Sequence, residues 1–439
     1  MICIAPRLSA LCASTLLILA CLTFQPSCAQ TPTGVTVALT GGRVIDGTGR
    51  APLEQATLVI TNGRIAAIGP SASVPIPAGA VRIDISGKTI LPGLINAHGH
   101  LNVDANTKLP VSEHLRQRLR LYAEYGVTTV VSLGSTDADE AEDLKIRDEQ
   151  RKTIPDRARL YTAGAFAIGK TPEEARKAVD RLADEKVDII KYKINGLPDD
   201  MTPDIYGALV DEAKKRGLLT AVHIFNLKDA KRAVEKGTDI LAHSVRDQDV
   251  DQALIAEMKR QDVAYIPTLT RDLSVFVYET EPAFFQDPFF LRGMYAYRTE
   301  VEILKAPVRQ EMTRNSSQAQ ASKPALRQAM RNLKIISDAG IPIAMGTDTG
   351  SANDLGRWQG YFEHVELEMM VQAGLTPMQA LMAATSDAAR IMKLDPLGTL
   401  APGKWADLLV LNANPLTDIR NTRQIDSVWI AGRRLPDRK

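Results

Sequence analysis

The 439-residue chain carries 53 lysines and arginines against 52 aspartates and glutamates, and 45% of its residues are apolar. This ordinary globular composition excludes a disordered or fibrous protein. A formal net charge of +1, without a long run of one sign, gives no basic surface for nucleic acid or an anionic membrane. The length suits a barrel of roughly 250 residues together with a smaller domain.

The first 29 residues have the pattern of a signal peptide. Arg7 supplies the positive start, residues 16–22 form a short apolar core, and Ser27-Cys28-Ala29 offers small residues before a cleavage site. The apolar run is too short to span a bilayer comfortably, so we predict no membrane span. We expect cleavage after Ala29 and export, with the bacterial periplasm as the destination. Lipid anchoring at Cys21 is the weaker alternative.

Cysteine usage limits the chemistry of the exported chain. All 4 cysteines of the sequence fall inside the predicted signal peptide: Cys3, Cys12, Cys21 and Cys28. The mature chain would therefore have no disulfide, no cysteine nucleophile and no cysteine-ligated zinc. Any metal ion must be held by histidine, aspartate, glutamate or modified lysine.

Short strands occur at both ends of the mature chain. Residues 30–90 alternate or run apolar, with Asn62-Gly63 as a hairpin turn between two strands. Residues 397–439 contain two further strands, 406–411 and 426–430. We predict a small composite β-sandwich domain, built from 30–90 and 397–439, with the remaining residues 91–396 inserted between its two parts.

Residues 91–396 alternate between apolar strands and amphipathic helices, which is the pattern of a parallel α/β barrel. The expected strands are 95–100, 128–133, 159–163, 187–191, 218–223, 239–243, 264–267 and 341–348. We therefore predict an α/β fold of the (β/α)8 TIM-barrel type. Catalytic groups of such barrels come from the C-terminal strand ends. The polar residues at these ends are His98, His100, Lys191, His223, His243 and Asp348.

His98 and His100 close the first of these strands. Because side chains alternate along a strand, two histidines separated by one residue point to the same face and can share one metal ion. Taken alone, such a pair is more often two surface histidines than a metal site. The interpretation therefore depends on the rest of the chain.

The segment 269–325 is longer than a barrel connection requires, and it is rich in phenylalanine and tyrosine. It lies after the seventh predicted strand, on the expected active-site side. One interpretation is a lid or substrate wall. The other is helical packing or a subunit interface in a homo-oligomer.

Six sequence pieces, in this order, resemble the amidohydrolase superfamily and within it the imidazolonepropionase-like and prolidase-like branch. They are Leu91-Pro92-Gly93-Leu94-Ile95-Asn96-Ala97-His98-Gly99-His100, Val187-Asp188-Ile189-Ile190-Lys191, Ala221-Val222-His223, Leu241-Ala242-His243, Gly346-Thr347-Asp348 and Gly403-Lys404-Trp405-Ala406-Asp407-Leu408. Together they span nearly all the mature chain.

The resemblance implies two divalent metal ions, zinc being the expected one. His98 and His100 would hold the more buried ion, and His223 and His243 the more exposed one. Asp348 would be a ligand of the first ion and the catalytic base. Lys191 would bridge both ions as a CO₂-derived carbamate, because a protonated ammonium has no acceptor for a metal ion.

This ligand set implies hydrolysis of an amide (C–N) bond. Two ions lower the pKa of a bridging water, so that hydroxide can attack a polarised carbonyl near neutral pH. Asp348 would accept the proton of the water and pass it to the leaving nitrogen. The implied substrate is a small peptide-like molecule, an N-acyl amino acid or an aryl amide.

Several alternatives remain open at this stage. Lys193 shares a strand face with Lys191 and could be the bridging residue. Without a carbamate the site would hold one metal, as in deaminases and imidazolonepropionase, with His243 as a hydrogen-bonding group. His364 follows the eighth strand, and we interpret it as structural. A non-catalytic binding protein on the same scaffold is the alternative of another class.

Three residues are candidates for substrate binding. Phe225 stands two positions after His223, where dipeptidases of this branch carry a tyrosine or histidine that meets the substrate carboxylate. This departure favours a more apolar substrate. Arg271 and Arg357 could still bind a carboxylate, although surface salt bridging is the alternative for each.

Overall fold

The computed structural model describes residues 34–103, 107–153, 155–351 and 355–436, which belong to one compact unit, Gly34–Lys439. The predicted signal peptide and all four cysteines lie outside the described residues. No helix within the described ranges combines the length and the apolar character that crossing a bilayer requires.

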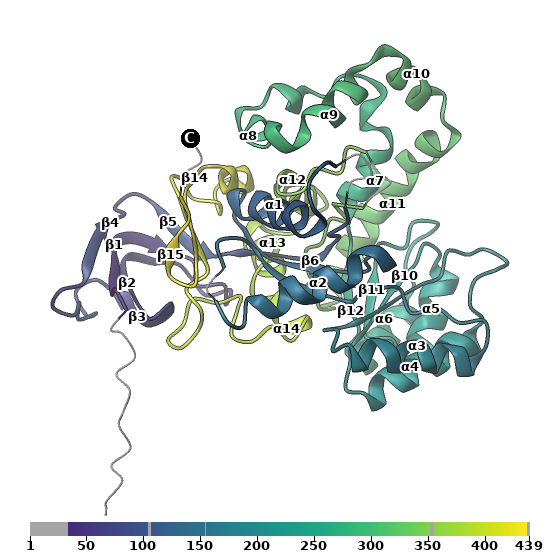
Figure 1. The fold of residues 1–439 in the computed structure, drawn as a ribbon. Helices are drawn as coiled ribbons and strands as arrows, with labels where there is room; N and C mark the ends of the chain where they lie inside the picture. The colour runs from purple at the N-terminus through teal and green to yellow at the C-terminus, as the bar shows by residue number, and fades with distance from the viewer. Residues whose placement is uncertain (1–33, 104–106, 154, 352–354, 437–439) are drawn as a thin grey trace, which may run out of the picture. The chain divides into compact units, whose positions relative to one another are not determined.

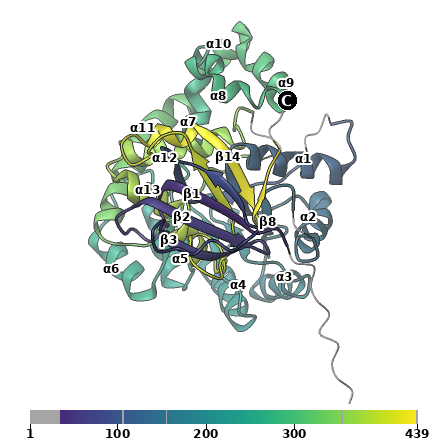
Figure 2. The same ribbon diagram turned by 90° about the vertical axis from the view of Figure 1, so that its left-hand side faces the viewer.

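Strands from both ends of the chain form one sheet. Its eight strands follow the order β15-β14-β13-β5-β1-β2-β3, with β4 also paired to β1. Figure 2 shows β1 and β2 from the start of the chain in the same sheet as β14 from its end. The strands are β1 (Val37–Val44), β2 (Leu53–Thr61), β3 (Arg64–Pro70), β4 (Val81–Asp84), β5 (Thr89–Pro92), β13 (Leu408–Leu411), β14 (Ile425–Ile430) and β15 (Arg433–Arg434).

We predicted a β-sandwich, whereas the structure connects these strands in a single sheet. Strand β1 explains the connection. Its first half pairs in parallel with β4, from Val37 to Thr40, and its second half pairs with β5 through Arg43 and Val44. The register with β2 shifts between these halves, at Gly42. Such irregularities bend a strand, so one strand can serve two neighbours.

Seven parallel strands carry the site. They pair in the orders β6-β7-β8 and β12-β11-β10-β9. These strands are β6 (Leu94–Gly99), β7 (Val127–Ser132), β8 (Arg159–Thr162), β9 (Ile190–Lys193), β10 (Thr220–His223), β11 (Ile240–Ala242) and β12 (Ala264–Ile266). The helices between them are α1 (Val111–Glu124), α2 (Asp137–Glu149), α3 (Pro172–Asp184), α4 (Pro203–Lys215), α5 (Leu227–Glu235) and α6 (Gln252–Gln261). Figure 1 shows this alternation of strands and helices.

Backbone hydrogen bonds link the two parallel sheets on both sides. Beyond β8, Ala167 N donates to Lys191 O of β9 at 2.8 Å. On the other side, Tyr265 N of β12 donates to Pro342 O, and Ala97 N of β6 donates to Met345 O, each at 2.9 Å. The fold is therefore TIM-barrel-like.

The eighth predicted strand, 341–348, is wrong as a strand. This segment forms only one isolated bridge, between Ile343 and Tyr265. Pro342 has no N–H to donate to a ladder, which interrupts regular pairing. Gly346 then passes directly against β6, where a Cβ would lie 2.6 Å from His98 Cβ and 2.5 Å from Ile266 Cγ2. Only glycine fits at this crossing.

A buried ion pair connects the eight-stranded sheet to the parallel strands. Arg159 of β8 donates to both carboxylate oxygens of Asp407, at 2.5 and 3.1 Å. The backbone carbonyl of Asp407 accepts from Gly93 N at 2.9 Å, immediately before β6 begins. Removing one partner of such a pair typically costs about 3–5 kcal/mol. The last of the six sequence pieces thus helps to fix the start of the strand that carries His98.

The aromatic insertion is largely a packed helical layer. Its elements are α7 (Leu269–Phe276), η1 (Val277–Glu279), η2 (Ala283–Gln286), α8 (Pro288–Leu291), α9 (Met294–Lys305), α10 (Pro307–Asn315) and α11 (Ser317–Asp338). Phe285, Phe290 and Tyr297 are buried in one cluster with Trp358 and with Tyr125, the residue that follows α1. The remaining helices are α12 (Tyr361–Gln372), α13 (Pro377–Ala383), α14 (Ser386–Ile391) and η3 (Ile419–Arg423).

Candidate metal centre

A cavity of about 610 Å³ opens at the C-terminal ends of the parallel strands. All six side chains predicted as metal ligands line it: His98, His100, Lys191, His223, His243 and Asp348. They come from β6 and the residue that follows it, from β9 and β10, and from the segments that follow β11 and precede α12. The structure therefore brings together residues separated by as many as 250 positions in the sequence, counting from His98 to Asp348.

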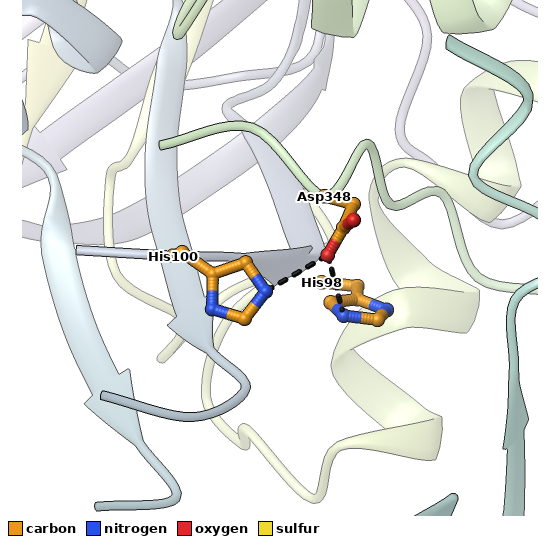
Figure 3. A group of neighbouring side chains, drawn as sticks. All are labelled: His98, His100 and Asp348. Atoms are coloured by element: carbon orange, nitrogen blue, oxygen red, sulfur yellow. Dashed lines mark hydrogen bonds and ion pairs between the residues drawn. The ribbon is translucent and has the colours of Figure 1, made fainter. Parts of the chain in front are cut away.

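Three of these residues form the tightest cluster. One ligand atom each of His98, His100 and Asp348 lies within 4.8 Å of the others. Asp348 Oδ1 is 2.8 Å from His100 Nε2 and 3.2 Å from His98 Nε2. Figure 3 shows both imidazole rings turned toward this carboxylate oxygen. All three side chains are buried.

The hydrogen bonds of His100 leave its inner nitrogen for a cation. His100 Nδ1 lies 2.8 Å from the carbonyl oxygen of Gly134, which can only accept, so Nδ1 carries the proton. In a neutral imidazole Nε2 then presents a lone pair. That lone pair faces Asp348 Oδ1, another acceptor, and a positive charge between them is needed to make this contact favourable. A metal ion fits this requirement.

The remaining histidines lie beside the cluster. The ring centroid of His243 is 4.6 Å from that of His98 and 4.3 Å from that of His223. His243 Nδ1 is 2.7 Å from Thr268 Oγ1, which leaves Nε2 as the second ring nitrogen available to a ligand. His243, Thr268 and Asp348 all have left-handed backbone conformations, with φ of 72°, 49° and 59°. Non-glycine residues adopt these values rarely, and often at functional sites.

Burial keeps the imidazoles neutral. It lowers the pKa of His98 to about 3, and the nearby Lys191 acts in the same direction. Burial likewise holds the pKa values of His223 and His243 well below their usual range. Neutral imidazole is the form that binds metal ions.

The two candidate lysines differ in their surroundings. Lys191 is 1% exposed, and its Nζ has no hydrogen-bond partner among the described residues. Burial lowers the pKa of Lys191 to about 7, although Asp348 acts in the opposite direction. Lys193 is exposed, and its Nζ lies 3.6 Å from the ring centroid of Phe166. Only Lys191 combines burial with an amine that is readily deprotonated, as carbamate formation requires.

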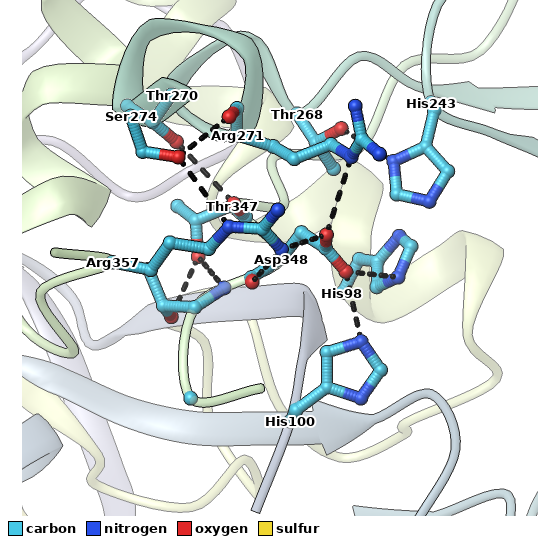
Figure 4. Close-up of polar contacts among 12 residues, drawn as sticks. His98, His100, His243, Thr268, Thr270, Arg271, Ser274, Thr347, Asp348 and Arg357 are labelled. Atoms are coloured by element: carbon cyan, nitrogen blue, oxygen red, sulfur yellow. Dashed lines mark hydrogen bonds and ion pairs between the residues drawn. The ribbon is translucent and has the colours of Figure 1, made fainter. Parts of the chain in front are cut away.

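Two arginines contact Asp348 on the side away from the histidines. Arg357 Nη1 lies 2.5 Å and Arg271 Nε lies 3.5 Å from Asp348 Oδ2 (Figure 4). Burial alone would raise the pKa of Asp348, but the Arg357 guanidinium holds it well below its usual range. The carboxylate is therefore ionised, with guanidinium donors at Oδ2 and the imidazoles of His98 and His100 near Oδ1.

We predicted that Phe225 contacts the substrate, and among the described residues it does not line the cavity. Instead the ring is 37% exposed, and the guanidinium of Arg246 lies 4.6 Å from its centroid. Strand β10 ends at His223, so the alternation that would place Phe225 on the same face as His223 stops there.

The structure also adds residues that the sequence analysis did not identify. Thr268 orients His243, and Arg309 of α10 lines the cavity from the aromatic insertion. Tyr278, Met312 and Thr313 of the insertion also line it, so part of this segment is a cavity wall. His364 lies outside the lining, and its ring bonds Tyr125 O and Thr422 Oγ1. No sequence motif marks Thr268 or Arg309, because each reaches the site only through tertiary packing.

The donor set fits divalent metal ions. Both ring nitrogens of His98 and Lys191 Nζ are buried without a hydrogen-bond partner among the described residues. Unsatisfied buried polar atoms are costly and call for a ligand. Neutral imidazoles with a carboxylate are the ligands that zinc and similar ions prefer.

Comparisons with known proteins agree with this geometry. Residues 89–435 match the model of the Amidohydrolase family, so the chain belongs to that family. An imidazolonepropionase of Streptomyces avermitilis is 24% identical over 399 residues, which cover 88% of this chain and 89% of the relative.

Solved structures give the same result. A protein from Bifidobacterium longum assigned provisionally as a prolidase is 28% identical and has a TM-score of 0.76, covering 93% of this chain and 97% of its own. A Xaa-Pro dipeptidase with bound methionine is similar in fold, with a TM-score of 0.70 at 21% identity, covering 91% of this chain and 99% of its own. The chain is thus an imidazolonepropionase-like and prolidase-like amidohydrolase, a hydrolase that acts on C–N bonds.

Proposed function

We propose that this enzyme hydrolyses an amide bond in a small substrate with two divalent metal ions, zinc being the expected one. The observation that carries the proposal is the convergence of four buried or half-buried histidines, the unpartnered amine of Lys191 and the carboxylate of Asp348 in one cavity. His98, His100 and Asp348 would hold one ion. His223 and His243 would hold the other. Lys191 would bridge both.

The bridging role requires a chemical change at Lys191. The neutral amine attacks CO₂, a N–C bond forms, and one amine proton is lost to give an anionic carbamate. Burial of the amine favours the neutral form that this reaction needs. When bound, the ions supply activation of water and polarisation of the substrate carbonyl.

Asp348 is positioned to move the proton during hydrolysis. Its Oδ1 faces His98 and His100, whereas its Oδ2 faces Arg357 and Arg271. The carboxylate is therefore oriented before substrate binds, which lowers the reorganisation needed for proton transfer. We propose that it takes the proton of the attacking water and delivers it to the leaving nitrogen.

The charge of the cavity supports a substrate that carries a carboxylate. Arg271, Arg309, Arg357 and Lys193 line it, while Asp348 is the one acidic side chain among its described lining residues. A cleft lined by one sign of charge concentrates ligands of the opposite sign. Peptide-like molecules and N-acyl amino acids meet this condition better than neutral aryl amides. This reverses the expectation that Phe225 suggested.

A second candidate is hydrolysis of a cyclic amide, or deamination, at a single metal ion. The imidazolonepropionase relative motivates it. The two functions differ in metal content and in the state of Lys191. Elemental analysis of the purified protein should give two ions per chain, and mass spectrometry of the intact protein in bicarbonate buffer should show one added CO₂. One ion per chain without the adduct would favour the second candidate.

The substrate class can be tested with the same metal-loaded protein. We expect release of amine from N-acyl amino acids or dipeptides, and less from matched esters or amides in which the carboxylate is blocked. Equal rates for the free and blocked acids would exclude recognition of a carboxylate.

We also propose that residues 1–29 direct export to the periplasm. Positive, apolar and small residues follow one another there in the order of a signal peptide. Cell fractionation and sequencing of the mature amino terminus test this. A cytoplasmic protein with an intact amino terminus would contradict it.

A further inference from the structure

Glu363, in the first turn of α12, joins separate segments through one buried carboxylate. Its Oε1 accepts hydrogen bonds from Asn96 Nδ2 at 2.7 Å, Thr347 Oγ1 at 2.8 Å and Thr349 Oγ1 at 2.9 Å. Its Oε2 accepts from Gly360 N at 2.6 Å. The side chain is 0% exposed. None of these donors is one of the candidate metal ligands.

The segments that Glu363 joins carry His98 and Asp348, two members of the candidate metal cluster. Asn96 lies two residues before His98, and its Oδ1 accepts from His98 N at 3.0 Å. Thr347 and Thr349 stand on either side of Asp348. Asp348 N in turn donates to His98 O at 2.7 Å. The Glu363 carboxylate therefore holds both the strand that carries His98 and the turn that carries Asp348.

The backbone at Asp348 needs such support. Its φ of 59° lies in the left-handed region, which a non-glycine residue keeps only where its surroundings hold it. Thr347 and Thr349 are anchored to the same oxygen of Glu363, so the turn between them is restrained at both ends. The restraint keeps the Asp348 carboxylate directed at the two histidines.

Glu363 is a buried carboxylate held by neutral donors. Within the described part of the chain, its partners are two hydroxyls, an amide side chain and a backbone N–H, and no cation bonds to it. Burying a carboxylate without a cation is costly, and an apolar side chain could fill the same space more cheaply. Glu366 shares this burial, and what distinguishes Glu363 is that its donors Asn96, Thr347 and Thr349 lie within two residues of His98 or Asp348.

We infer that Glu363 is a positioning residue of the metal centre, which sets the geometry of His98 and Asp348 through Asn96, Thr347 and Thr349. The inference rests on the proposed metal-dependent function. Groups that orient metal ligands typically change metal affinity by about 10- to 100-fold when they are replaced. Glu363 is thus expected to change the affinity for the metal ion without contacting the ion itself.

The variant Glu363→Gln tests this with a nearly unchanged shape. Its amide group places a donor among groups that all donate to Glu363, so at least one of the four hydrogen bonds is lost. We expect the zinc dissociation constant of the mature protein to rise by about 10- to 100-fold, measured by competition with a chromophoric chelator. Unfolding of the metal-free protein is measured in parallel.

Glu366→Gln is the matched control. Glu366 lies one turn further along α12, is also 0% exposed, and accepts hydrogen bonds from Leu269 N, Thr270 N and Thr270 Oγ1 at the start of α7. Its donors follow Thr268, the partner of His243, and do not lie beside His98 or Asp348, so this variant should lose stability without a comparable loss of affinity for the ion held by His98, His100 and Asp348. A general loosening of α12 would instead weaken zinc binding equally in both variants, and that result would overturn the inference.

Milder variants decide the matter if Glu363→Gln does not fold. Thr349→Val keeps the side-chain shape and removes one donor to Glu363, and Asn96→Ala removes the link to the strand of His98. We expect weaker zinc binding in each. Wild-type affinity in both, or in Glu363→Gln itself, would overturn the inference while leaving the proposed function intact. Wild-type protein that binds no metal would overturn both.

Discussion

Arg357 Nη1 lies 2.5 Å from Asp348 Oδ2, so the proposed catalytic base is bound by a guanidinium on one side and faces two imidazoles on the other. This arrangement uses both oxygens of one carboxylate. The oxygen near the histidines can serve a metal ion, while the guanidinium fixes the plane of the group. It also keeps Asp348 ionised, as the lowered pKa indicates.

The variant Asp348→Asn should abolish hydrolysis while the other ligands retain metal. The amide has nearly the same shape but cannot accept and deliver the proton, a contribution that is typically worth about 10²- to 10⁴-fold in rate. Turnover of an N-acyl amino acid and metal content by elemental analysis are measured together. Unchanged turnover would remove Asp348 as the base.

The variant Arg357→Met tests the orientation of that base. The loss of the guanidinium releases Asp348 Oδ2, and we expect kcat to fall by about 10- to 100-fold as the carboxylate loses its fixed geometry. Arg357→Lys should recover only part of this loss, because a lysine cannot reproduce the planar contact of a guanidinium. Full activity of the methionine variant would show that the 2.5 Å contact is not needed for catalysis.

Lys191 and Lys193 provide a matched pair for the bridging role. Lys191→Arg cannot form a carbamate, since arginine stays protonated, and metal content should fall below two ions per chain. Lys193→Arg should keep two ions and the added CO₂, because the exposed Lys193 packs on Phe166 rather than in the buried cluster. An adduct that persists in the Lys191 variant and disappears in the Lys193 variant would reverse the assignment.

Strand periodicity made much of the candidate site predictable. The alternation of side chains placed His98 and His100 on one face, and the ends of parallel strands supplied Lys191 and His223. The structure brings all of them to one cavity. Thr268, Arg309 and Glu363 were not predictable, because they reach the site from a turn, the aromatic insertion and a distant helix.

The fold was predictable to a similar degree. The alternating pattern predicted parallel strands and intervening helices, and the TIM-barrel-like arrangement confirms that part. The prediction failed where a single residue changes the backbone. Pro342 interrupts the eighth strand, β1 pairs with both β4 and β5 on either side of the irregularity at Gly42, and β10 ends at His223, so strand alternation does not extend to Phe225.

His364 predicts how stability depends on pH. Burial lowers its pKa to about 3, from an ordinary value of 6.5. The folded protein keeps His364 neutral while the unfolded chain binds a proton below pH 6.5. Its contribution to stability is therefore complete above pH 6.5 and is lost as the pH falls toward 3, with a limiting slope of about 1.4 kcal/mol per pH unit.

The variant His364→Gln isolates this effect. The glutamine amide can still donate to Tyr125 O, the partner of His364 Nε2, but it does not titrate. Urea unfolding between pH 7 and pH 4 should give a shallower decline for the variant than for the wild type. Parallel curves for the two proteins would show that His364 is not the group responsible.

The aromatic insertion should separate into residues that hold the fold and residues that select the substrate. Phe290 is fully buried in its aromatic cluster, so Phe290→Ala should lower the free energy of unfolding by about 3–5 kcal/mol.

Arg309 lines the cavity, and its Nε has no hydrogen-bond partner among the described residues. Arg309→Met should therefore change unfolding little but raise KM for a substrate with a free carboxylate. The blocked acid, which lacks the charge, provides the comparison. If KM for the blocked acid rises equally, Arg309 shapes the cavity but does not bind the substrate carboxylate. The proposed preference for anionic substrates must then rest on Arg271 and Arg357 alone.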